Sequence, residues 1–213
     1  MRNHLAAFTL LALPTLSTPA PASAQQVARG AAQASAQESL AAGRKALAEG
    51  RFEEALAAFE QAAAADGGAP LTRMWIGRAI SALGRHDDAL ALADELRKLG
   101  LPGGDVDYLF GYALAGFTKA SLASGGNAFT QGQFLDAAAA LKRALAHNPK
   151  DYADAWLPLA ECAWYGQDLP GARAAAAKAT ELEPRSSAAH ALLGRVAMAQ
   201  YAAASEEAEK QAH

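Results

Sequence analysis

The chain has one cysteine, no strongly basic segment and no apolar run long enough to cross a bilayer. Cys162 stands alone, so it cannot form an internal disulfide, and we expect it to be a small buried residue. Nineteen Lys and Arg side chains against 22 Asp and Glu give a net charge of −3 without any basic cluster. We therefore expect neither nucleic-acid binding nor a polybasic membrane patch. The apolar run at residues 5–17 is shorter than the roughly 20 residues of a membrane span.

Sequence motifs for catalysis and metal binding are also missing. There is no H-E-x-x-H, C-x-x-C, phosphate loop or G-x-S-x-G elbow, and the histidines have no partner at metal-ligand spacing. The carboxylate pairs Glu53-Glu54 and Asp87-Asp88 stand where helices should begin, which indicates a role at the positive end of a helix dipole. We expect no enzyme activity, no cofactor and no metal.

Residues 1–24 have the features of a secretory signal peptide. Arg2 supplies a positive start, an apolar run follows, and Ala22-Ser23-Ala24 fits a small-x-small cleavage site. An uncleaved anchor is the alternative. We expect the protein to be exported, to the periplasm or the exterior of a bacterium, with no membrane span after cleavage. Residues 25–35, rich in Ala, Gln and Ser, are interpreted as a flexible linker.

The rest of the chain is predicted to be all-α, because alanine is abundant and strand-type alternation does not occur. Small and apolar residues recur with a period of 34. The clearest repeat has Trp156, Leu159, Ala160 and Ala163 on one helix face, then Ala172, Ala176 and Ala179 on a second, which Pro184 ends. The same register assigns His190, Leu193, Gly194 and Ala197 to the next helix, and Gly43, Gly77 and Gly111 take the place of Ala160 in earlier repeats.

These residues resemble the tetratricopeptide repeat pattern W-x₂-L-G-x₂-Y, A-x₃-F, P. The resemblance extends from about residue 36 to the end of the chain. It implies a right-handed solenoid of helical hairpins with about four and a half repeats. The units are residues 36–69, 70–103, 104–152, 153–186 and an incomplete unit, 187–213. Small residues such as Ala160 and Ala172 should lie where two helices approach most closely.

Two units depart from the period. The third carries about 14 extra residues, 119–132, interpreted as two added helical turns on each helix of the hairpin; an irregular loop is the alternative. Phe117, Leu122 and Phe129 make this segment apolar, so it is a possible second contact site. The last unit lacks a turn signal after Gly194 and is predicted to be one long helix whose polar tail caps the stack. A truncated array is the alternative.

The family resemblance also implies a concave groove lined by the first helix of each unit. The residues implied for it are Leu40, Arg44, Met74, Arg78, Tyr108, Tyr112, Leu157, Glu161, Trp164, Arg195 and Met198. The alternative is that the arginines are solvated and Trp164 packs between units. The paired lysines and asparagines with which the family clamps a C-terminal carboxylate are missing here, so that binding mode is not carried over.

The functional prediction is an exported adaptor that binds a protein or peptide partner in its concave groove. The alternative is a structural subunit of a cell-envelope assembly that contacts its partners through the long third hairpin.

Overall fold

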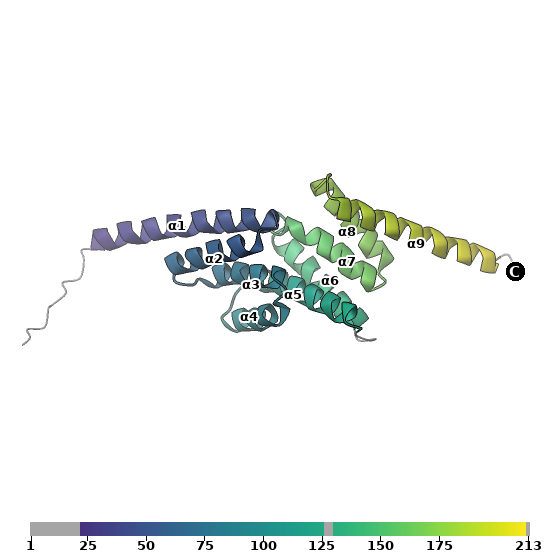
Figure 1. The fold of residues 1–213 in the computed structure, drawn as a ribbon, viewed down its shortest axis with the longest axis horizontal. Coiled ribbons are helices and arrows are strands. Elements are labelled where there is room, and N and C mark those ends of the chain that lie inside the picture. Colours follow the sequence, from purple (N-terminus) through teal and green to yellow (C-terminus); the bar gives the residue numbers. More distant parts are fainter. Residues whose placement is uncertain (1–21, 126–129, 212–213) are drawn as a thin grey trace, which may run out of the picture.

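All regular structure in the computed structural model, which describes residues 22–125 and 130–211, is helical. Its elements are α1 (Ala22–Ala48), α2 (Phe52–Asp66), α3 (Pro70–Ala82), α4 (His86–Lys98), α5 (Gly103–Ala123), α6 (Thr130–His147), the 3₁₀ turn η1 (Ala153–Ala155), α7 (Trp156–Tyr165), α8 (Leu169–Leu182) and α9 (Ser187–Gln211). Successive helices pair into hairpins that stack along the molecule, and α1 and α9 project from opposite ends (Figure 1). The predicted all-α hairpin solenoid is confirmed.

Small residues set the distance between the two helices of each hairpin. A Cβ atom added at Gly43 would lie 2.5 Å from the Phe59 ring, and one added at Gly111 would lie 2.7 Å from Leu141. Ala160 and Ala172 take these places in the fourth hairpin and are fully buried. Side chains this small allow helix axes to approach to the lower end of the usual 8–10 Å range.

The third hairpin is longer than its neighbours, as predicted. Helix α5 has 21 residues and α6 has 18, whereas α3 and α4 have 13 each. Residues 119–123 and 130–132 are helical, so the irregular-loop alternative is wrong for these residues. Gly125, at φ +86°, takes the left-handed conformation just after α5, which costs glycine little.

The structure corrects the flexible linker predicted at residues 25–35, because these residues belong to α1. Alanine and glutamine have high helix propensity, and α2 then packs against the later part of the same helix, where Ala36 is the first buried residue. Most of the predicted signal peptide, residues 1–21, lies outside the described residues. None of the helices in the described ranges is long and apolar enough to span a membrane.

The long terminal helix is confirmed as α9, but its packing face differs from the predicted one. Ala189, Leu192 and Val196 are buried, while His190, Gly194 and Ala197 are exposed. The reason is that α9 packs only on the hairpin that precedes it, whereas the predicted face is the one that a following helix would cover. The polar end of α9 projects from the stack instead of capping it (Figure 1).

The close helix contact in the fourth hairpin gives a stability prediction. Ala172→Leu should lower the free energy of unfolding by about 1–3 kcal/mol, because added methyl groups must overpack a fully buried site. Ala174→Leu, two residues away on an exposed part of α8, is the matched control and should leave stability nearly unchanged. Urea unfolding measures both; equal stability of the two variants would contradict the assigned helix contact.

Candidate functional site: the inner face and its cleft

One face of the stack, called the inner face here, carries Arg44 of α1, Arg78 of α3 and Tyr112 of α5. The segment between α6 and α7 crosses this face and is anchored there by Tyr152. The Tyr152 ring stacks on Tyr108 of α5 with 4.0 Å between ring centroids, and its hydroxyl donates to the buried Asp105 carboxylate. Burial raises the pKa of Tyr152, and the hydrogen bond to Asp105 raises it further, so the hydroxyl remains a donor. Asp105 is also 3.2 Å from His147 Nε2. This segment is therefore a fixed part of the fold.

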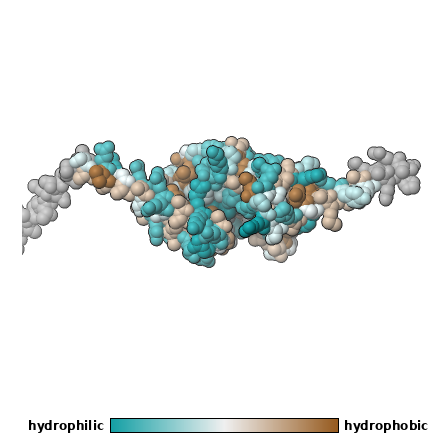
Figure 2. Space-filling model, turned by 90° about the horizontal axis from the view of Figure 1, so that it is seen from above, coloured by the Kyte–Doolittle hydropathy of each residue, from teal (hydrophilic) through white to brown (hydrophobic). Residues whose placement is uncertain are grey.

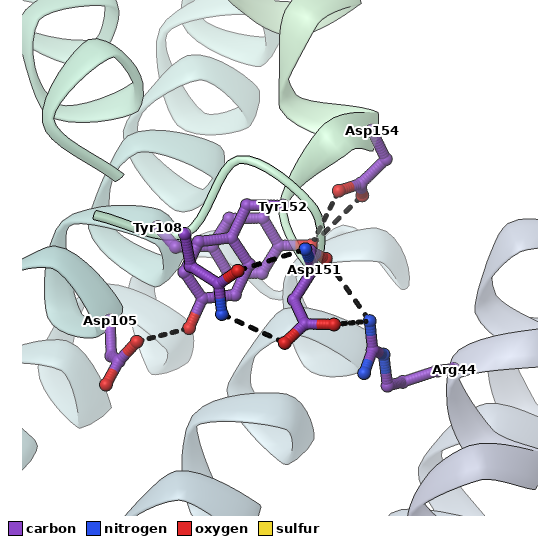
Figure 3. Close-up of polar contacts among 7 residues, drawn as sticks. Arg44, Asp105, Tyr108, Asp151, Tyr152 and Asp154 are labelled. Atoms are coloured by element: carbon purple, nitrogen blue, oxygen red, sulfur yellow. Dashed lines mark hydrogen bonds and ion pairs between the residues drawn. The ribbon is translucent and has the colours of Figure 1, made fainter. Parts of the chain in front are cut away.

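Asp151 links the segment to α1, 107 positions earlier in the chain. Arg44 Nη2 donates to Asp151 Oδ1 over 2.7 Å (Figure 3). The same guanidinium lies 4.9 Å from the centroid of the Trp75 ring. Asn148 donates to the other carboxylate oxygen over 2.9 Å. The hydrogen bond from Arg44, followed by that from Asn148, lowers the pKa of Asp151 and keeps it ionised at neutral pH.

Asp154 is the second carboxylate of the segment, and three side chains of the inner face surround it. Tyr108 donates over 3.0 Å and Tyr112 over 2.7 Å, while Arg78 Nη2 lies 3.5 Å away. Burial raises the pKa of both tyrosines, and Asp154 raises it further, so both hydroxyls stay protonated. The Arg78 guanidinium stacks 3.4 Å from the centroid of the Tyr112 ring.

Arg78 is the least satisfied member of this cluster. Its side chain is only 11% exposed, and Nε is buried with no hydrogen-bond partner among the described residues. A guanidinium has five N–H donors, and the single hydrogen bond it makes here is long. A buried donor without an acceptor is unfavourable by about 1–3 kcal/mol. Arg78 is thus a buried cation with unused donors.

A cleft of about 340 Å³ lies beside Arg78 and Tyr112 and separates the first hairpin from the fourth. Leu47 and Phe52 line it on one side, and Leu157 and Leu182 line it on the other. A second cavity, of about 410 Å³, shares the lining residues Arg78, Tyr112 and Pro158. His86, Lys119 and Glu161 also line that cavity, and the last two form an ion pair of 2.8 Å.

The structure brings several of the predicted groove residues together. Arg44, Arg78, Tyr108 and Tyr112 converge on the two aspartates, and Leu157 and Glu161 line the adjoining cavities. Trp164 lies farther along the stack, under the guanidinium of Arg195 at 5.7 Å. Leu40 packs partly buried against the core, and Met198 is exposed on α9.

Two predicted groove residues are corrected. Met74 and Tyr108 are both fully buried, so neither side chain is available to a partner. Each belongs to the packing face of its helix, next to the aromatic core that Trp75 and Tyr152 fill. Both lie one helical turn before residues that do reach the groove, Arg78 and Tyr112. The repeat pattern did not predict that Tyr152, in the segment between α6 and α7, would cover Tyr108.

The predicted second contact on the third hairpin is placed only in part. Phe117 is partly buried and shares a surface hollow with Gly84 and His86, and Leu122 is 40% exposed. Phe129 lies outside the described residues. The structure therefore leaves Leu122 as the exposed apolar residue of this group.

Sequence reasoning missed the residues that organise the inner face: Trp75, Asp105, Asp151, Tyr152 and Asp154. Asp151 and Asp154 fall in the segment between two units, where the repeat pattern does not specify the residue type, and Asp105 is in the first turn of α5. The sequence did contain a pattern that could have indicated them. Asp151 and Asp154 are three positions apart, with Tyr152 between them, just before Trp156.

The described residues contain no group of His, Cys, Asp and Glu side chains that could hold a metal ion. Cys162 is fully buried, as predicted. Burial, with a smaller effect of Glu161, raises the pKa of its thiol to about 12, so the reactive thiolate is scarce at neutral pH.

A sequence profile described as "Tetratricopeptide repeat" matches residues 46–100 and 128–196. The match covers more than half of the chain, and the hairpins found in the structure agree with it. The chain belongs to the tetratricopeptide repeat family.

Solved structures and curated proteins give no further information on function. Among solved structures the chain is similar to YrrB, described as "a TPR protein with an unusual peptide-binding site". The identity is 19% and the TM-score is 0.47, over 85% of this chain and 84% of that chain, which is too distant to bear on function. No curated protein matches the chain.

The two aspartates of the inner face allow a matched stability test. Asp154→Ala should lower the free energy of unfolding by about 2–3 kcal/mol, because it leaves the hydroxyl of Tyr108 and the cation of Arg78 without their acceptor. Asp151→Ala removes an exposed ion pair and should cost less than about 1 kcal/mol. Urea unfolding distinguishes the two, and similar losses would contradict the unequal roles assigned here.

The state of Cys162 is tested by alkylation. A thiol-specific reagent at mildly alkaline pH should label the folded protein only at the slow rate of local opening, since the thiol is buried and its pKa is raised. Concentrated guanidinium should make labelling fast. Rapid labelling of the folded protein, followed by mass spectrometry, would show that the thiol is accessible.

Proposed function

We propose that this protein is an adaptor that binds an extended segment of a partner protein in the cleft between the first and fourth hairpins. The observation that carries the proposal is Arg78, a nearly buried cation with an unpartnered Nε beside the cleft. Apolar side chains supply much of the lining, and Asp154 and Glu183 are its acidic residues. Membership in the tetratricopeptide repeat family supports the same conclusion, because its members are generally scaffolds and not enzymes.

The chemistry of the lining defines the segment that fits. Leu47, Phe52, Leu157 and Leu182 favour apolar side chains, and Arg78 favours a carboxylate. We therefore expect a segment in which an Asp or Glu is flanked by apolar residues. On the face seen in Figure 2, hydrophilic side chains are widespread, and the strongly hydrophobic patches are small and separate. That face offers no broad apolar surface as a competing site.

Leu182 is the best position at which to test binding in the cleft by mutation. It lines the cleft, yet it is 48% exposed and is not part of the core. A displayed library of random peptides, selected on the protein, should enrich sequences with an acidic residue between apolar ones. Leu182→Asp should weaken the best peptide by about tenfold or more, since a carboxylate repels the acidic residue and loses apolar contact. Leu99→Asp, at a similarly exposed leucine outside the cleft, is the control.

Fluorescence polarisation measures the affinity of the selected peptide for the Leu182→Asp and Leu99→Asp variants. Peptide binding should also weaken with added salt. Selection without any enriched pattern, or equal affinity for both variants, would contradict the cleft as the binding site.

Export is part of the proposal and rests on the signal peptide predicted at residues 1–24, which would place the adaptor in the periplasm or outside a bacterial cell. A structural role in an envelope assembly is the second candidate. Leu122 and Leu135, both about 40% exposed on the long third hairpin, favour it.

A further inference from the structure

Helix α9 has a packing position that no described residue fills. In the first three hairpins the glycine of the first helix meets a side chain of the second helix. Gly43 meets Phe59, Gly77 meets Leu92 and Gly111 meets Leu141, all at 3.0 Å or less from the added Cβ. Gly194 stands at the equivalent place in α9, and no described atom lies within 4 Å of its added Cβ. The structure describes no helix after α9 that could pack there.

The open face of α9 continues from Gly194 in helical steps of three and four residues. Ala197, Met198 and Tyr201 follow it, and Met198 is 74% exposed and Tyr201 77% exposed. The opposite face, with Ala189, Leu192 and Val196, is buried against the preceding hairpin. The apolar face therefore lies opposite the body, and the outer half of α9 projects clear of it (Figure 1). A second helix could reach this face without displacing any part of the fold.

The charges beside this face select the partner helix and its direction. Arg195 and Glu206 are both exposed and stand 11 residues apart, which is about three turns and places them on the same flank of the face. Within one chain the Arg195 guanidinium lies 5.7 Å from the centroid of the Trp164 ring, and this contact leaves its side chain exposed. When two identical helices pair antiparallel, residues on the same flank face each other. Arg195 of each copy then lies opposite Glu206 of the other copy. The midpoint of the two paired helices falls beside Tyr201.

We propose that α9 is a self-association surface, through which two copies of this chain pair antiparallel with Gly194, Ala197, Met198 and Tyr201 at their contact. Glycine and alanine let the two helices approach closely, and the methionine and tyrosine supply the apolar area. A single pair of helices makes a contact at the small end of specific interfaces, below about 1,200 Å² in total. The dimer is therefore weak and forms at micromolar or higher concentration.

Sedimentation equilibrium of the purified protein, from about 1 µM to about 1 mM, measures the association. The mass should rise toward that of a dimer, and Tyr201→Glu should weaken association by about tenfold or more, because it places a charge at the centre of an apolar contact. Tyr201 is exposed in the single chain, so the variant should keep its helical circular dichroism and melting temperature. Leu99→Glu, at an exposed leucine directly after α4, should associate like the wild type.

Charge reversal tests the antiparallel arrangement. Arg195→Glu alone and Glu206→Arg alone should each weaken association, and the double variant should restore it, because the two charges are exchanged. Arg195→Glu also removes the cation over Trp164, which the double variant does not restore, so recovery in the double variant is due to the exchanged charges. A wild-type protein that stays monomeric over the whole range overturns the proposal, as does association that survives Tyr201→Glu. Loss of association in Val27→Glu would also overturn it, because it would show head-to-tail contact through the exposed start of α1.

Discussion

The inner face of this molecule depends on one buried side chain, that of Tyr152. Its ring lies against Tyr108 of α5 and 6.1 Å from Trp75 of α3, and its hydroxyl is bound to Asp105. A segment fixed at that depth carries Asp151 to Arg44 on the first hairpin and Asp154 to Arg78 on the second. Because these contacts hold hairpins that are distant in sequence against the same segment, the first and fourth hairpins face each other across a cleft. Without the segment that Tyr152 anchors, helix packing alone would join only successive hairpins.

The general architecture was predictable because it depends on local and periodic features. Helix propensity, the 34-residue period and the small residues at Gly43, Gly111 and Ala160 specify hairpins that stack, and the two extra turns of the third hairpin preserve that phase. The candidate site was predictable only in part. Arg78, Tyr112 and Leu157 were found because they repeat one step round from the packing face. Asp151 and Asp154 were missed because they come from the segment between two units, which the repeat period does not constrain.

The errors have physical causes as well. Residues 25–35 lack apolar periodicity and were interpreted as a linker, yet alanine-rich sequence continues a helix wherever a packed portion nucleates it. The packing face of α9 was displaced because the repeat rule assumes a helix on both sides. At the end of the described stack only one side is covered, so Val196 is buried while Gly194 is not.

The cleft and the open face of α9 use different helices, and this separation has a consequence for binding strength. The cleft is formed by α1, α2, α3, α5, α7 and α8, whereas the pairing surface lies on the projecting part of α9. Association through α9 would leave both clefts free and hold them in one assembly. A partner with two suitable segments would then bind the second cleft intramolecularly, at an effective concentration set by the length of chain between the segments. A cleft of about 340 Å³ with one buried cation in its lining gives modest affinity by itself, so pairing would add avidity.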